Sequence, residues 1–158
     1  MDQKRELLRH AVATVAYRGG KAVRDAPGSF GTYTPDGSPR TAVKIVAHLG
    51  DLFDWALSQA KGAEAWTDST PQEWEHAVAR FFAALERFDA FLASDAALAV
   101  APEKLFQGAV ADALTHVGQL AMMRRLAGAK MKSENYARAD IVAGRVGADQ
   151  TAPKREFD

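Results

Sequence analysis

An aspartate and a histidine lie four residues apart in an apolar stretch of the chain, residues 105–123, which reads LFQGAVADALTHVGQLAMM. On a helix, Asp112 and His116 lie one turn apart on the same face. A carboxylate on so apolar a helix is costly unless it has a partner. Carboxylate and imidazole groups are ligands of zinc, iron, nickel and manganese, so this pair suits one side of a divalent metal site.

A third candidate ligand is His48, which lies three residues after Ile45 and four before Leu52. It therefore borders the apolar stripe of another predicted helix, and helical bundles build metal sites from side chains on facing helices. Three protein ligands leave a coordination position for water or substrate, as in catalytic sites. The residues alone leave a second interpretation open, in which Asp112 forms a buried ion pair with His48, His116 or an arginine of the first helix.

The elements that must position these side chains are helices, because apolar residues recur at helical spacing along most of the chain. We predict four helices, over residues 2–25, 38–61, 70–94 and 102–128. The second begins with Ser38 as N-cap and Pro39 at the first helical position, and the third begins with the capping box Thr70-Pro71-Gln72-Glu73. No segment alternates clearly enough to predict a strand.

Four helices with short loops predict an all-α fold, an up-down four-helix bundle over residues 1–128. Residues 129–158 are more polar and form a C-terminal extension that packs on the bundle, with mobile last residues. Phe30 and Tyr33 lie in a loop rich in proline and glycine, and we expect them to pack over one end of the bundle. Arg80 is expected to be a surface charge.

The composition excludes several classes of function. Lys plus Arg and Asp plus Glu number 20 each, so the net charge is zero, which argues against nucleic acid and anionic membranes as partners. The chain has no cysteine, which excludes disulfides, thiolate nucleophiles and cysteine-ligated metals. We find no signal peptide, membrane span, phosphate-binding glycine loop or nucleophile elbow. We therefore expect a soluble cytoplasmic protein.

Two segments resemble motifs of the DinB-like superfamily: THVGQLAMMRRLAG at 115–128 resembles its last-helix motif, and HLGDLFDWAL at 48–57 its second-helix motif. The order and separation of the motifs also fit, so the resemblance covers roughly residues 5 to 128. The family is a four-helix bundle that usually binds a divalent metal through three histidines. By position, His48 and His116 match two of them and Asp112 replaces the third, so the resemblance implies a metal site with two histidines and one carboxylate.

Four further residues are candidates for the surroundings of this site. Gln119, one turn beyond His116, is placed to hydrogen-bond a ligand or a bound water. Asp51, three residues after His48, is either a fourth ligand or a solvated or capping carboxylate. Trp55 and Met123 either line the pocket or belong to the core.

The resemblance implies a metal-dependent transferase that acts with a low-molecular-weight thiol, since some members of the family use their metal in this way. The alternatives are a non-catalytic metal-binding, structural or stress-related helical bundle, and a metal-dependent hydrolase. The expected cofactor is a divalent ion of zinc, nickel, iron or manganese, and the expected partners are a small-molecule substrate or thiol and a second copy in a homodimer. No catalytic residue is assigned from the sequence.

Overall fold

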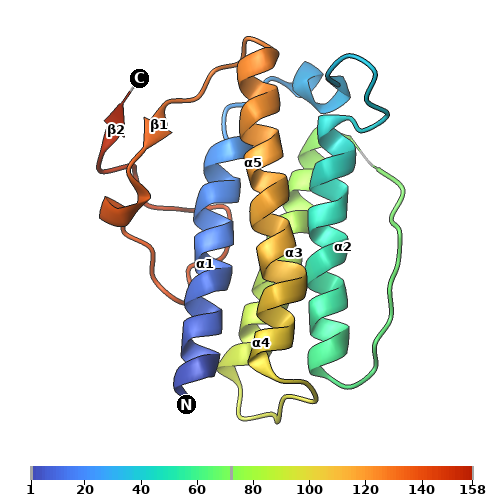
Figure 1. Ribbon diagram of the computed structural model, residues 1–158, viewed down its shortest axis with the longest axis vertical. Helices are drawn as coiled ribbons and strands as arrows, with labels where there is room; N and C mark the ends of the chain where they lie inside the picture. Colours follow the sequence, from blue (N-terminus) through green and yellow to red (C-terminus); the bar gives the residue numbers. More distant parts are fainter. Residues whose placement is uncertain (1, 72, 158) are drawn as a thin grey trace.

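The computed structural model describes residues 2–71 and 73–157, and long helices lying side by side dominate it (Figure 1). The first three are α1 (Gln3–Val23), α2 (Ala42–Ala60) and α3 (Trp74–Ala93). A fourth helical segment consists of α4 (Pro102–Leu105), a π-helical turn η2 (Phe106–Val110) and α5 (Ala111–Leu126). The prediction of an all-α protein is confirmed for the described part of the chain, apart from one very small sheet.

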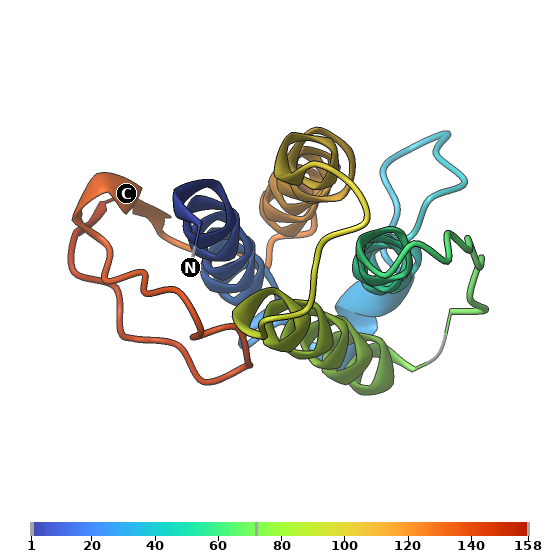
Figure 2. The same cartoon turned by 90° about the horizontal axis from the view of Figure 1, so that it is seen from below.

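The helices enclose one core. The α1 helix packs against α3 and α5, and α2 also packs against both α3 and α5. Figure 2 shows this arrangement end-on, with α5 next to both α1 and α2. At the centre, the fully buried ring of Phe53 lies 6.4 Å from that of Phe81 and 6.0 Å from that of Phe88. Burial of these large apolar side chains is the main source of stability.

Two helices begin later than the sequence indicates. Ser38 is not the N-cap of α2, because its hydroxyl accepts a hydrogen bond from the backbone N–H of Arg40 within a turn, and Thr41 is the N-cap residue. The α3 helix begins at Trp74, with Glu73 as its N-cap residue. The predicted capping box includes Gln72, which lies outside the described residues.

The loop before α2 contains a short 3₁₀ helix, η1 (Gly28–Thr32). It places the side chain of Phe30, which is 2% exposed, against the ring of Trp74 at 5.4 Å in an edge-to-face contact. The ring of Tyr33 stacks on Phe30 at 6.2 Å. Both aromatic residues therefore pack at one end of the helices, as their positions in the loop predict.

The helix predicted over residues 102–128 contains a π-helical turn, which the sequence analysis did not predict. Its last residue is Val110, two residues before Asp112. A π turn adds one residue to a helical turn and so changes which side chains face inward after it. Gly108 within this turn faces the ring of Trp55, from which a Cβ atom at this position would lie 3.4 Å, an ordinary packing distance.

The C-terminal extension contains strands, although the sequence analysis predicts none. Strands β1 (Ser133–Glu134) and β2 (Glu156–Phe157) pair in antiparallel register and flank a 3₁₀ turn, η3 (Tyr136–Arg138). Two-residue strands are too short for a pattern of alternation to reveal them. The chain end up to Phe157, which we expected to be mobile, is thus part of a sheet.

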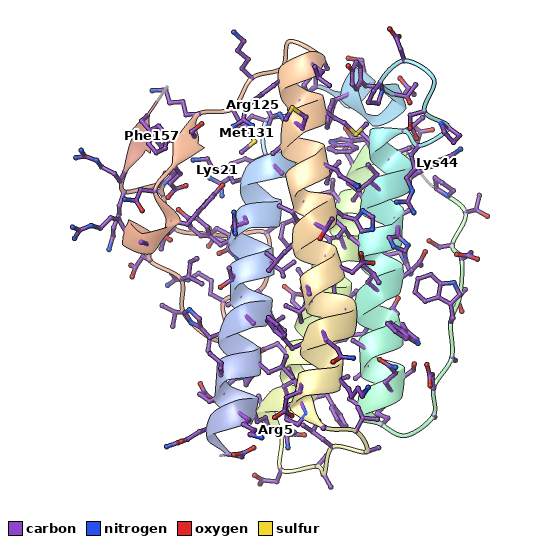
Figure 3. The ribbon with its side chains drawn as sticks, in the orientation of Figure 1. Arg5, Lys21, Lys44, Arg125, Met131 and Phe157 are labelled. Atoms are coloured by element: carbon purple, nitrogen blue, oxygen red, sulfur yellow. The ribbon has the colours of Figure 1, made fainter. Side chains whose placement is uncertain are left out.

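The extension is joined to α1 by buried polar groups. The Glu134 carboxylate, whose side chain is 0% exposed, accepts hydrogen bonds from Tyr17 Oη at 2.7 Å and from Lys21 Nζ at 2.8 Å. Lys21 also donates to Glu156 at 2.7 Å. Figure 3 shows Lys21 on the side of α1 that faces the extension. None of the helices in the described residues has both the length and the apolarity needed to cross a bilayer.

Candidate metal centre

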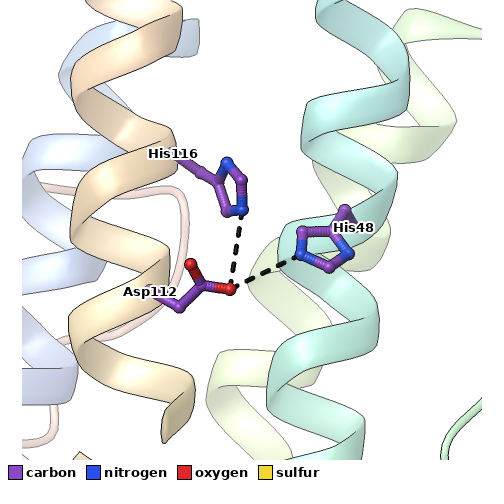
Figure 4. Close-up of side chains that lie close together, drawn as sticks. All are labelled: His48, Asp112 and His116. Atoms are coloured by element: carbon purple, nitrogen blue, oxygen red, sulfur yellow. Dashed lines mark ion pairs between the residues drawn. The ribbon is translucent and has the colours of Figure 1, made fainter. Parts of the chain in front are cut away.

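Three donor side chains converge between α2 and α5 (Figure 4). One carboxylate oxygen of Asp112, Oδ2, lies 3.6 Å from Nε2 of His48 and 3.6 Å from Nε2 of His116. All three donor atoms lie within 4.8 Å of one another. The two helices thus bring together residues that are 64 or more positions apart in the sequence.

Apolar packing on each helix fixes the two histidines. On α2, His48 lies between Ile45 and Leu52, which are both buried against the core. On α5, His116 lies between Ala113 and Leu120, which are completely buried. Because neighbours one turn away on each side are anchored in the core, the two imidazoles are held at the seam where α2 packs against α5.

The environment of Asp112 differs from the prediction. Its side chain is 47% exposed, whereas those of His48 and His116 are 22% and 7% exposed. The stretch over residues 105–123 is apolar but not buried on all sides, since Phe106 is 48% and Met122 is 54% exposed. The cost of burying a charge therefore does not by itself require a partner for Asp112. The convergence of the three donor atoms is the stronger evidence for a site.

The separations suit ligands of a shared ion better than a hydrogen-bonded ion pair. A hydrogen bond between nitrogen and oxygen is about 2.7 to 3.2 Å long, and 3.6 Å exceeds that range. Two ligand atoms at about 2.1 Å from a zinc ion, at a tetrahedral angle, lie about 3.4 Å apart. The two oxygen–nitrogen distances therefore suit ligands of a shared divalent ion, whereas the largest separation among the three donor atoms, up to 4.8 Å, must shorten when an ion binds.

Gln119 fixes the chemical form of His116. Its side-chain oxygen lies 2.8 Å from Nδ1 of the imidazole. A carbonyl oxygen accepts a hydrogen bond, so Nδ1 carries the proton in this arrangement and Nε2 presents its lone pair toward Asp112. Metal-binding histidines commonly donate their second ring N–H in this way. The predicted neighbour Gln119 thus holds His116 in the tautomer that a metal needs.

His48 is also held in the neutral form. Burial is the main cause that lowers the pKa of His48, and the neighbouring His116 imidazole and Arg40 guanidinium lower it further. The Asp112 carboxylate acts in the opposite direction but does not outweigh them. A neutral imidazole is the form that binds metals, so this environment prepares His48 for that role at neutral pH.

One tryptophan lies beside His48, and a second packs against the first. The ring of Trp66, in the loop between α2 and α3, contacts the imidazole at 5.6 Å between centroids, and Trp55 contacts Trp66 at 5.9 Å. The indole N–H groups donate to Glu64 and Asp68. Trp55 is a predicted pocket or core residue, whereas Trp66 is not among the residues predicted from the sequence. A large aromatic residue in an otherwise polar loop was the available signal.

Asp51 lies apart from the three donors. Its carboxylate, 4% exposed at the side chain, pairs with Arg80 Nη2 at 2.7 Å and accepts hydrogen bonds from Ser69. Arg80 also pairs with Asp54 at 2.9 Å. The prediction that Arg80 is a simple surface charge is wrong, because its guanidinium joins α3 to α2 and the following loop.

The arginines of the first helix do not supply a partner for Asp112. Arg5 donates to backbone carbonyl groups at the end of α3, those of Phe91 and Leu92 among them. Arg9 forms a two-point pair with Asp89. An ion pair between Asp112 and an arginine of the first helix therefore finds no support. The neighbours of the Asp112 carboxylate are His48 and His116.

Comparisons with known proteins do not identify a relative. No family model, no curated protein and no solved structure matches this chain. The interpretation of the site therefore depends on its own geometry.

Proposed function

We propose that the chain binds one divalent ion of zinc, nickel, iron or manganese through His48, Asp112 and His116. The observation that carries this proposal is the position of Asp112 Oδ2, which lies 3.6 Å from Nε2 of each histidine. Within the described residues, these three form the group whose nitrogen and oxygen atoms converge closely enough to share an ion. The His116–Gln119 contact supports it, because it turns the Nε2 lone pair toward the other two donors.

The finer description of the fold belongs to the same proposal. We infer an up-down four-helix bundle of the DinB-like type, in which Asp112 replaces one of three histidines. Two observations support this inference: His48 lies on the second long helix, and Asp112 and His116 lie four residues apart on the last one. A carboxylate in this position favours harder ions and stronger retention of water than a third imidazole would.

The proposed reaction is a transfer that uses a low-molecular-weight thiol. A divalent ion in this site would act as a Lewis acid and lower the pKa of a thiol or water beside it. Side chains around the donors orient and shield them. Gln119 orients the His116 imidazole, and Trp66 covers one side of His48. The half-exposed Asp112 keeps the site accessible to solvent.

Metal content of protein purified without a histidine tag tests the proposal. We expect about one equivalent of metal in the wild type, and strong loss in the variants His48→Ala, Asp112→Ala and His116→Ala. The matched control is His76→Ala, since His76 is exposed on α3 and should be dispensable. Substoichiometric metal in the wild type, unchanged by all three substitutions, would contradict the proposal.

Activity measurements separate the three classes of function. Turnover of a chromogenic electrophile that depends on an added thiol supports the transferase. Turnover of ester or amide substrates without a thiol supports a metal-dependent hydrolase. Stoichiometric metal with no turnover in either panel indicates a metal-binding bundle without catalysis.

A homodimer is also part of the proposal, and exposed apolar side chains support it. Leu7 on α1 is 69% exposed and Phe106 is 48% exposed, and both line one apolar depression of about 500 Å³. Such side chains are costly to leave in water over a continuous patch. Sedimentation equilibrium of the wild type against Leu7→Lys measures whether this face joins two copies.

A further inference from the structure

A cavity lies on the α2–α5 seam, close to the three donors. Its volume is about 250 Å³, and its walls include Ile45 from α2 and Gln119, Met122 and Met123 from α5. Gln119 contacts His116, and Ile45 lies three residues before His48. The cavity therefore begins one helical turn from both histidines, on the side away from Asp112.

The walls of this cavity are mainly apolar. Ile45 and Met123 are 2% and 4% exposed and form its floor, while Met122 and Leu126 are 54% and 60% exposed at its rim. A ligand that covered the rim would remove apolar surface from water. Methionine side chains are flexible and polarisable, so they adapt to ligands of different shapes.

One cationic side chain, Arg40, lines the same cavity, and no acidic side chain does. Arg40 is exposed, and within residues 2–71 and 73–157 its guanidinium forms no recorded hydrogen bond or ion pair. The neighbouring cation Lys44, by contrast, donates to the backbone carbonyl of Pro39. Arg40 is thus a free positive charge beside an apolar cavity whose lining residues Ile45 and Gln119 lie one helical turn from His48 and His116. A planar guanidinium binds a carboxylate through two hydrogen bonds.

We propose that this cavity is the substrate subsite of the metal centre, and that Arg40 selects small molecules in which an apolar segment ends in a carboxylate. In this arrangement the metal-binding group of the ligand lies at His48, Asp112 and His116, and the apolar segment follows α5 toward Arg40. The placement of the metal-binding end of the ligand rests on the function proposed above. Binding of the carboxylate end at Arg40, by contrast, is measurable in metal-free protein.

The size of the ligand follows from the helix. Seven residues separate His116 from Met123, which corresponds to about 10 Å along α5 at about 1.5 Å per residue. A linear molecule with a thiol at one end, about six carbons and a carboxylate at the other end spans that length.

The first test uses metal-free protein labelled with ¹³C at the methionine methyl groups. Met122 and Met123 line the cavity, and Met131 lies outside it, so the protein carries its own reporters and an internal control. We expect hexanoate to shift the Met122 and Met123 signals saturably, with at least about fivefold tighter binding than hexanol, because an arginine–carboxylate pair is a strong hydrogen-bonded contact. The Met131 signal should not move.

Two variants test whether Arg40 causes the preference for hexanoate over hexanol. We expect Arg40→Gln to abolish the difference between hexanoate and hexanol while leaving hexanol binding unchanged. Lys44→Gln is the matched control, because it removes one positive charge one turn away on the side of α2 that faces away from α5 (Figure 3). If both variants weaken hexanoate equally, or if neither ligand moves the Met122 and Met123 signals, the proposed subsite is overturned.

The second test measures whether a ligand held by Arg40 also binds the metal through its thiol. Cobalt(II)-loaded protein is titrated with 6-mercaptohexanoate and 6-mercaptohexanol, and thiol binding is read from the cobalt absorption spectrum. We expect the acid to bind at least about fivefold more tightly, and Arg40→Gln to remove that gap. Equal binding of the two thiols in the wild type overturns the subsite and leaves the metal proposal intact. Failure to bind cobalt overturns the metal proposal, and the hexanoate titration still decides the subsite.

Discussion

The side-chain oxygen of Gln119 lies 2.8 Å from Nδ1 of His116, on the opposite side of the imidazole ring from Asp112. This contact determines which ring nitrogen carries the proton, and with it the direction in which the lone pair of the other nitrogen points. Gln119 therefore acts on the site through His116, as a positioning residue.

Gln119→Leu should lower metal affinity about 10- to 100-fold while the protein still binds one ion, because loss of such a contact frees the ring to rotate and to change tautomer. Competition with a chromophoric chelator measures the affinity. Thr115→Val is a suitable control, since Thr115 lies next to His116 but its hydroxyl bonds to a backbone carbonyl of its own helix. Equal affinity in wild type and Gln119→Leu would show that the contact plays no part in metal binding.

Replacement of Asp112 distinguishes a ligand from a charge partner. If Asp112 is a ligand, Asp112→His should keep or strengthen metal binding by supplying a third imidazole, and Asp112→Ala should weaken it. Metal content and chelator competition give the two results. If both variants instead destabilise the fold and neither alters metal content, Asp112 serves only as a partner for the histidine charges.

The lowered pKa of His48 predicts how the stability of the metal-free protein changes with pH. Burial, His116 and Arg40 place the folded-state pKa below the ordinary value of 6.5. Between these two pKa values the unfolded chain binds more protons at this site, so the free energy of unfolding falls as pH drops through that window. Urea unfolding of the wild type and of His48→Gln from about pH 8 to pH 5 measures how much His48 contributes to the pH dependence of the free energy of unfolding. A difference between the two proteins that stays constant with pH would refute it.

The attachment of the C-terminal extension depends on a buried charge pair. Lys21→Met leaves the fully buried Glu134 without its cation, and we expect a loss of about 3 kcal/mol in the free energy of unfolding. Lys4→Met provides the contrast, because the Lys4–Glu103 pair is exposed on both sides and should contribute nothing measurable. Chemical denaturation measures both. Comparable losses in the two variants would mean that burial of the Lys21 pair has no special effect.

Sequence patterns predict the helices well, because burial of one face makes apolar residues recur at helical spacing. The stripe of Ile45, Leu49, Leu52 and Phe53 is buried as predicted, and so are Phe81 and Phe88 on α3. The ends are less predictable. Ser38 has the chemistry of an N-cap, but its hydroxyl accepts a hydrogen bond from Arg40 in the turn before α2.

Several features of the site depend on tertiary contacts and leave little trace in the sequence. The π turn before Asp112, the contact of Trp66 with His48 and the pairing of Asp51 with Arg80 each involve segments that meet only in the folded chain. The positions of Asp112, His116 and Gln119 are different, because a one-turn spacing on a helix already determines which side chains share a face.

The partners of Lys21 also set an order of events during synthesis. Glu134 and Glu156 lie 113 and 135 residues further along the chain, so the ribosome releases them long after α1 has emerged. Until then neither of these carboxylates can pair with the Lys21 ammonium group. The helices α2 and α3, by contrast, are separated only by residues 61–73, so both have left the ribosome much earlier. A nascent chain that ends before residue 134 therefore lacks both of the carboxylates that pair with Lys21 in the folded protein.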